Sequence, residues 1–136
     1  MKMSGAVLLL LGLAALLPAK ASACASEQGF HRLATGDAEV AYRFEPADLK
    51  VGQFFAAEVI ACRAPGGESV ADVLLDATMP AHGHGMNYRA SSARMDDGRY
   101  RFTGLMLHMP GAWRITIDLV QGTKRTRLTQ DVNLGP

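Results

Sequence analysis

Residues 113–119, with the sequence WRITIDL, alternate large apolar side chains with polar ones without interruption. Because successive side chains of a β-strand point to opposite faces, this pattern predicts a strand with one face in the core and one in water. Trp113 begins the apolar face, and we expect its indole to be buried with its N–H hydrogen-bonded. Such alternation is typical of antiparallel sheets that are covered on one side only.

Similar segments recur along most of the chain, separated by turn residues such as Asp96-Asp97-Gly98 and Pro110-Gly111. Strands are predicted around residues 39–45, 53–62, 71–79, 87–94, 99–103, 113–119 and 125–134. Beyond the N-terminus no segment has the helical period. About seven short strands in a chain of this size predict an all-β fold, a single immunoglobulin-like antiparallel β-sandwich.

The N-terminus has the three parts of a signal peptide: Lys2, an apolar run over residues 6–17, and Ala21-Ser22-Ala23 before a cleavage site. The run is shorter than the roughly twenty apolar residues of a membrane-spanning helix. We therefore expect residues 1–23 to be removed, residues 24–37 to form an N-terminal segment and residues 38–136 to form the sandwich. The protein is expected to be exported to the periplasm.

Cys24 and Cys62 are the only cysteines, and both remain after the expected cleavage. An oxidising compartment favours a disulfide between them. The alternative is a lipoprotein, in which Cys24 is acylated and anchors the protein in a membrane. Against this alternative, Ala21 stands where such signals usually have leucine, and acylation would leave Cys62 as an unpaired thiol.

The formal net charge is +1, and it is near zero once Lys2 and Lys20 are removed with the signal peptide. Without a basic stripe, nucleic acid is not an expected partner. Ser91 and Ser92 lie in a polar segment without a nucleophile turn, and no glycine-rich phosphate-binding motif is present. We therefore expect no enzymatic activity.

Histidine and methionine concentrate in two segments, residues 79–88 (MPAHGHGMNY) and residues 106–111 (MLHMPG). Imidazole binds both Cu(I) and Cu(II), and thioether favours Cu(I). Zinc sites instead use cysteines, three histidines, or histidines with carboxylates, and the two segments contain neither cysteine nor carboxylate. The composition therefore predicts a copper site, for which the candidate ligands are His82, His84, Met86, His108 and Met109.

In an extended chain, residues two apart point the same way, so His82, His84 and Met86 could line one side of the first segment. Gly83 and Gly85 would let the backbone bend around an ion. The resulting site is expected at the rim of the sandwich, where the second segment adds its own ligands.

By the same parity, Met106 and His108 are expected to share a face that continues the inward side of Tyr100 and Phe102. Core packing is the alternative reading for Met79 and Met106, because methionine fills irregular gaps in cores. For His108 the alternative is a buried ring that is hydrogen-bonded to a carbonyl. His31 stands alone in a polar stretch and is expected at the surface.

Residues 76–80 (DATMP), 84–88 (HGMNY) and 104–113 (GLMLHMPGAW) resemble the YtkA-like domain family, a small exported sandwich similar to FixH-type and copper-chaperone domains. The resemblance extends in looser form over residues 38–134. It implies an immunoglobulin-like sandwich that works near copper or respiratory-oxidase assembly. The candidates that match position by position are His84, Met86, His108 and Met109, whereas Gly83 stands where a more variable residue is expected.

Two functions are consistent with these observations. The first is a periplasmic copper-binding or copper-delivery protein, whose partner would be a cuproprotein or an oxidase assembly factor. The second is a metal-free interaction module that docks to an oxidase or another envelope complex through a sheet edge or the same two loops. Contact of the protein itself with a membrane is expected only if Cys24 is lipidated.

Overall fold

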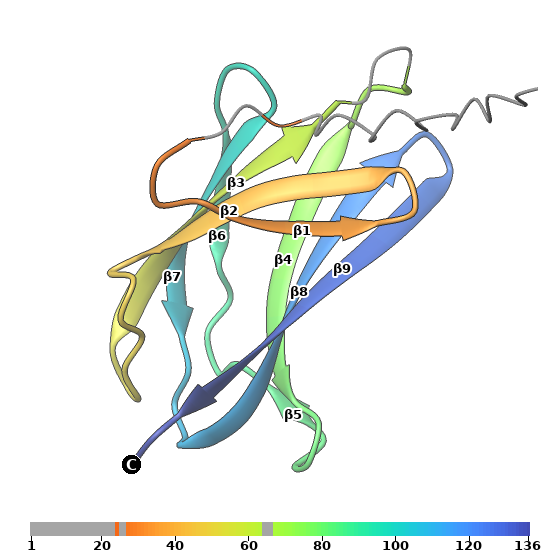
Figure 1. Ribbon diagram of the computed structural model, residues 1–136. Coiled ribbons are helices and arrows are strands. Elements are labelled where there is room, and N and C mark those ends of the chain that lie inside the picture. The colour runs from red at the N-terminus through yellow and green to blue at the C-terminus, as the bar shows by residue number, and fades with distance from the viewer. Residues whose placement is uncertain (1–23, 25–26, 64–66) are drawn as a thin grey trace, which may run out of the picture.

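The computed structural model describes Cys24, residues 27–63 and residues 67–136, and in these residues the chain forms two antiparallel sheets (Figure 1). The predicted signal peptide lies outside the described residues. The strands are β1 (His31–Thr35), β2 (Ala38–Glu45), β3 (Phe54–Cys62), β4 (Asp72–Met79), β5 (His84–Gly85), β6 (Ser91–Arg94), β7 (Arg99–Met106), β8 (Gly111–Gln121) and β9 (Lys124–Leu134). The described residues include no helix that is long and apolar enough to cross a bilayer.

One sheet has the order β1-β2-β3-β7-β6 and the other has the order β5-β4-β8-β9. The predicted all-β antiparallel sandwich is therefore confirmed. The predicted strands correspond to β2, β3, β4, β6, β7, β8 and β9, and the structure adds β1 and the two-residue β5. The sheet begins at His31, inside the segment that was expected to precede the sandwich, because β1 pairs along its whole length with β2.

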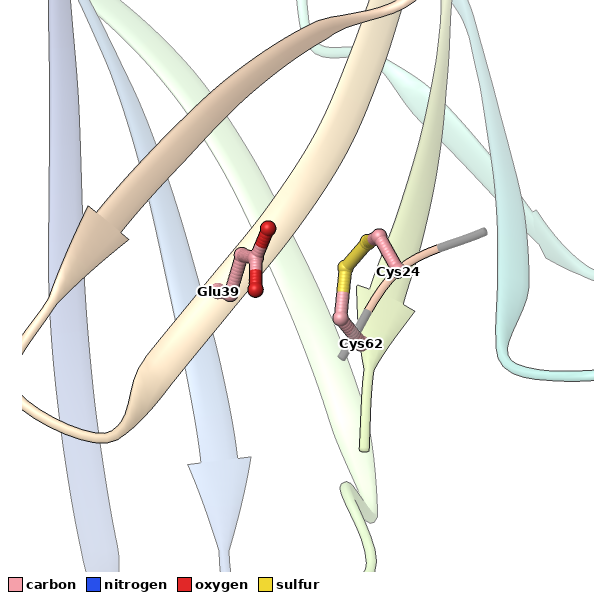
Figure 2. A group of neighbouring side chains, drawn as sticks. All are labelled: Cys24, Glu39 and Cys62. Carbon is pink, nitrogen blue, oxygen red and sulfur yellow. A yellow bond between two sulfur atoms is a disulfide. The ribbon is translucent and has the colours of Figure 1, made fainter. Parts of the chain in front are cut away.

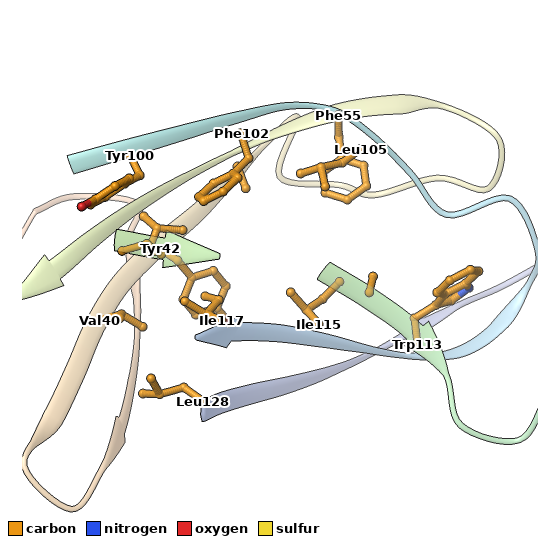
Figure 3. Close-up of a cluster of buried hydrophobic side chains, with 14 of the residues drawn as sticks. Val40, Tyr42, Phe55, Tyr100, Phe102, Leu105, Trp113, Ile115, Ile117 and Leu128 are labelled. Atoms are coloured by element: carbon orange, nitrogen blue, oxygen red, sulfur yellow. The ribbon is translucent and has the colours of Figure 1, made fainter. Parts of the chain in front are cut away.

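The core lies between the two sheets and consists of the inward faces that the alternation predicted (Figure 3). Trp113 is fully buried, and its indole N–H donates a hydrogen bond of 2.9 Å to the carbonyl of Met109, as expected for this residue. Ile115, Ile117 and Leu119 follow on the same face of β8 and are buried. Burial of each such side chain contributes about 1.5–3 kcal/mol relative to its exposure.

A β-bulge in β7 changes which residues face the core. Phe55 pairs with Leu105 and Ala57 pairs with Phe102, so β7 has one more residue than β3 in the interval. Gly104 lies in this interval with a φ of 76°, a left-handed conformation that glycine adopts without steric cost. After the bulge Leu105 and Leu107 are buried in place of the residues that strict alternation would select.

The expectation that Met106 and His108 continue the inward face of β7 is therefore wrong. The extra residue reverses the parity of the strand, so Leu105 and Leu107 take the inward positions and Met106 and His108 are only half-buried. The two residues consequently lie at the rim of the sandwich instead of deep in its core. His108 is left at the end where β7 gives way to the loop before β8.

Cys24 and Cys62 form a disulfide, with their Cα atoms 4.9 Å apart (Figure 2). Both cysteines are buried, and Phe30 packs against them. Cys62 ends β3 at the end of the sandwich opposite β5 (Figure 1). The disulfide thus holds the N-terminal part of the described chain at the end that is remote from the histidine-rich turn.

Candidate functional site

The first histidine-rich segment is a hairpin that joins β4 to β5. Met79 pairs with His84, and the amides of His82 and Gly83 donate hydrogen bonds to the carbonyl of Met79. Gly83 has a φ of 66°, which an L-residue with a side chain rarely adopts, so glycine is needed at this point of the turn. The sequence folds here because Pro80 and Gly83 both favour a turn.

Gly85 has a different role from the bending that the sequence suggested. It is extended and pairs with Thr78, and a Cβ atom placed on it would lie 3.3 Å from the carbonyl oxygen of Ala77. His82 lies in the turn and His84 in β5, so His82, His84 and Met86 do not form one continuous extended face. Gly85 therefore serves close packing of β5 on β4.

The hairpin and the loop after β7 bring three histidines into a row. The ring centroids of His82 and His84 are 5.7 Å apart, and those of His84 and His108 are 5.4 Å apart with an angle of 30° between the ring planes. His84 is therefore the middle ring. His82 is exposed, whereas His84 and His108 are half-buried.

Trp113 forms the buried side of this row. Its ring lies edge to face against His84 at 6.0 Å and against His108 at 5.4 Å. The hydrogen bond from its indole to Met109 also holds the loop that carries His108. The sequence identified Trp113 only as a core residue, although its place five positions after His108 kept it close to the second segment.

The ring nitrogens of the two inner histidines differ in their partners. Nδ1 of His84 lies 3.2 Å from the carbonyl oxygen of Gly85, and because a carbonyl only accepts, this contact assigns the proton to Nδ1. Nε2 of His84 then keeps its lone pair. Metal-binding histidines commonly have this arrangement, in which a carbonyl fixes the tautomer and the orientation of the ring.

Nδ1 of His108 is buried and has no hydrogen-bond partner among the described residues, a property that it shares there with the hydroxyl groups of Tyr100 and Thr126. The hydrogen bond to a carbonyl that was the alternative reading is therefore not made by this atom. A buried polar atom without a partner costs about 1–3 kcal/mol. His108 adjoins the ring of His84, a second imidazole that can bind a metal.

The two candidate methionine ligands are half-buried and pack against the core. Met86 also lines a groove with Asp76, Tyr88 and Phe102 on the open side between β4 and β6. Met79 is fully buried, which agrees with the alternative that it packs in the core, and Met106 is half-buried. The ring contacts thus join His84 and His108 to Trp113, and Met109 is tied to the same group through its carbonyl, which accepts the indole hydrogen bond.

The three imidazoles do not all converge on one point. Among the described residues, the one group of at least three His, Cys, Asp or Glu with ligand atoms within 4.8 Å of one another is Cys24, Glu39 and Cys62 (Figure 2). The sulfurs of that group are joined in the disulfide and offer no thiolate. The chemistry that the histidine row offers is therefore that of a pair, His84 and His108, with His82 beside it.

Two aromatic side chains are exposed near this end of the sandwich. Phe54 is 57% exposed and Tyr88 is 48% exposed, and their rings meet edge to face at 5.2 Å. Phe54 pairs with Met106 at the end of β7, and Tyr88 follows Met86 by two positions. Exposed aromatic pairs of this kind are common at protein interfaces. Sequence reasoning did not identify this pair.

Comparison with known proteins bears on family and fold. A family model described as YtkA-like matches residues 36–118. No curated protein matches the chain. The crystal structure of a DUF4426 family protein from Pseudomonas aeruginosa PAO1 superposes with a TM-score of 0.50 at 16% sequence identity, covering 80% of this chain and 97% of that one. At this identity the likeness supports the sandwich fold alone.

Proposed function

The chain belongs to the YtkA-like family, and on this premise we propose that it is an exported protein that binds a copper ion and delivers it to an envelope cuproprotein or to oxidase assembly. The observation that carries the proposal is the pair of His84 and His108, whose ring centroids lie 5.4 Å apart. Nδ1 of His108 has no hydrogen-bond partner among the described residues. Nε2 of His84 keeps its lone pair, because Nδ1 of the same ring carries the proton.

The spacing of the pair is compatible with a shared ion. Imidazole nitrogens bind a metal at about 2.0–2.1 Å, so two nitrogens on one ion lie about 4 Å apart or closer. Ring centroids at 5.4 Å allow this separation with small rotations of the rings. His82 would complete the site from the exposed turn, and Met86 and Met109 would supply thioether sulfur.

A site used for delivery must also release its ion. His82 is exposed, and it lies on the hairpin turn of residues 80–83, all of which are exposed. Exchange of this outer ligand for a ligand of the recipient would open a path for transfer without unfolding of the sandwich. No catalytic activity is part of the proposal.

The test is a titration of the purified exported protein with Cu(I) against a competing chelator. We expect the parent protein to compete, His84→Ala and His108→Ala to lose affinity by at least about 100-fold, a change of ~2.8 kcal/mol, and His82→Ala to lose less. His31→Ala is the matched control, because His31 is exposed on β1 and packs on Tyr42. Binding that survives both inner substitutions would refute the site.

A second candidate function is a metal-free interaction module, and the exposed pair of Phe54 and Tyr88 favours it. In that case a partner from the envelope would bind through these rings with or without copper. Phe54→Ser and Tyr88→Ser together should then abolish co-purification with the partner. Met95→Ser, which alters an exposed side chain before the turn between β6 and β7, should leave it intact. Retention of the partner by the double variant would exclude this surface.

A further inference from the structure

The candidate ligands of the histidine row are all electrically neutral. They are imidazole nitrogens and thioether sulfurs, and within the described residues none of the three histidines forms an ion pair with a carboxylate. The cysteines are paired in the disulfide, so no thiolate contributes charge either. An ion bound here would therefore keep its full charge, because the site has no anionic ligand to offset it.

The inner side of the row is also apolar. Trp113, whose ring contacts His84 and His108, is fully buried, and Met79, which pairs with His84, is 1% exposed. The indole N–H of Trp113 donates to the Met109 carbonyl, so this carbonyl oxygen is already engaged within the protein. Taking an ion out of water into such surroundings costs several kcal/mol, and in the Born description the cost rises with the square of the charge. A divalent ion is therefore disfavoured much more than a monovalent one.

From these observations we propose that the row selects the soft monovalent ion Cu(I), for which Ag(I) is a redox-inert substitute, over Cu(II) and Zn(II). This inference rests on the proposed copper-binding function and adds the charge and softness of the ion. Thioether sulfur is a ligand of Cu(I), whereas Cu(II) prefers tetragonal nitrogen and oxygen ligands. The inner pair of imidazoles alone also meets the low coordination number that Cu(I) accepts.

The geometry of the row is consistent with this selectivity. The structural and catalytic zinc sites of proteins have at least three protein ligands around one point. The described residues present two inner imidazoles near each other and do not bring all three histidines within 4.8 Å. Such an arrangement lacks the closed tetrahedral or tetragonal set that Zn(II) or Cu(II) would need. It can still hold an ion that binds two or three soft ligands.

The experiment compares Ag(I), Cu(II) and Zn(II) on the full exported protein, without thiol reductants, so that the Cys24–Cys62 disulfide stays closed. Trp113 is the only tryptophan of the chain, and it adjoins two of the histidines, so its fluorescence reports binding at this site. We expect Ag(I) to bind at least about 100-fold more tightly than Zn(II) or Cu(II), a difference of ~2.8 kcal/mol.

The outcomes separate the two proposals. If Cu(II) or Zn(II) binds as tightly as Ag(I), the selectivity is refuted while the copper-binding function stands. If no ion changes the fluorescence and the protein takes no ion from a competing chelator, the proposed function fails, and this inference fails with it. Tight binding of Ag(I) that is unaffected by His84→Ala and His108→Ala would place the ion elsewhere and would also overturn the inference.

Variants of the methionines test the contribution of sulfur. Met86→Leu with Met109→Leu preserves volume and removes both thioethers, and it should lower the ratio of Ag(I) affinity to Zn(II) affinity by about tenfold, or ~1.4 kcal/mol. Met95→Leu is the matched control, because Met95 is 48% exposed and precedes the hairpin turn between β6 and β7. An unchanged ratio in the double variant would refute the assignment of selectivity to the thioethers.

Discussion

Two regions differ in the hydrogen-bond partners of a buried polar side chain: the outer face of the β4-β8-β9 sheet, and the histidine end of the sandwich, which carries His82, His84 and His108. On the outer face, Asp118 is only 3% exposed, and its two carboxylate oxygens accept hydrogen bonds from Arg125 and Arg127 at 2.8–2.9 Å. At the histidine end, Nδ1 of His108 is buried without a partner among the described residues. The first group stabilises the fold, whereas under the proposed function the second is available to a metal ion.

The other sheet has a second satisfied carboxylate, which strengthens the contrast. Glu58 is 6% exposed, and Arg43 and Arg99 both donate hydrogen bonds to it. Burial alone would raise the pKa of Glu58, but the hydrogen bonds and charges of the two arginines outweigh burial and hold the pKa below its usual range. Arg43 and Arg99 also lie over the ring of Phe30. This network therefore fastens the segment before β1 to the sheet.

The largest effect should follow from removal of the residue that links the core to the histidine end. Trp113→Ala should lower the free energy of unfolding by about 3–5 kcal/mol, because it leaves a large cavity in the core. Chemical denaturation measures this loss, and the same variant should bind Ag(I) weakly because both inner rings lose their support. Trp113→Phe keeps a ring and removes the N–H, so it should cost less. Full stability in Trp113→Ala would contradict the described packing.

Asp118→Asn should have a smaller effect that depends on pH. The substitution weakens charge-assisted hydrogen bonds and should cost about 2 kcal/mol at neutral pH. In the parent protein, the hydrogen bond from Arg127 lowers the pKa of Asp118 against the opposing effect of burial, and the charges of Arg127 and Arg125 add to the lowering.

A pKa that is lower in the folded state fixes the direction of this pH dependence. The contribution of Asp118 is fully present above its unfolded pKa of about 3.9 and is lost as the pH falls through the lower folded pKa. Urea unfolding between neutral and acidic pH should therefore show a shallower acid-side loss in Asp118→Asn than in the parent. Equal slopes would mean that the carboxylate is not held as described.

His108→Leu should have the smallest effect on stability, within about 1 kcal/mol of the parent in the absence of metal, because it removes a buried nitrogen that has no partner. The same variant should lose the rise in melting temperature that a bound ion gives, since a ligand that binds only the folded state stabilises it. Thermal unfolding with and without Ag(I) measures both. A loss as large as that of Asp118→Asn would remove the contrast between the two regions.

The sequence was sufficient to predict most of the sandwich, because alternation at β2, β4, β8 and β9 reflects direct burial of one face. It was insufficient at β1, whose residues HRLAT are mostly exposed and show no apolar face. It was also insufficient at β5, because two residues are too few to show an alternation of apolar and polar side chains. Neither strand has a local signal, because pairing with a neighbour creates both.

The candidate site was predictable in composition and less so in geometry. The concentration of histidine and methionine in two segments identified the residues, but their directions depend on a turn at His82 and on the bulge at Gly104. One glycine in a strand does not reveal where an extra residue will be accommodated. The burial of Asp118 was also hidden, because its position on the polar face gave no sign that two arginines would cover it.

The extra residue in β7 shifts the alternation of side chains by one position for the rest of the strand. Every position after Gly104 points to the side opposite the one it would otherwise take, up to the end of the strand. Removal of that one residue would send Leu105 outward and draw Met106 toward the interior. The chemistry at the tip of this protein is thus set by an insertion that itself carries no functional group.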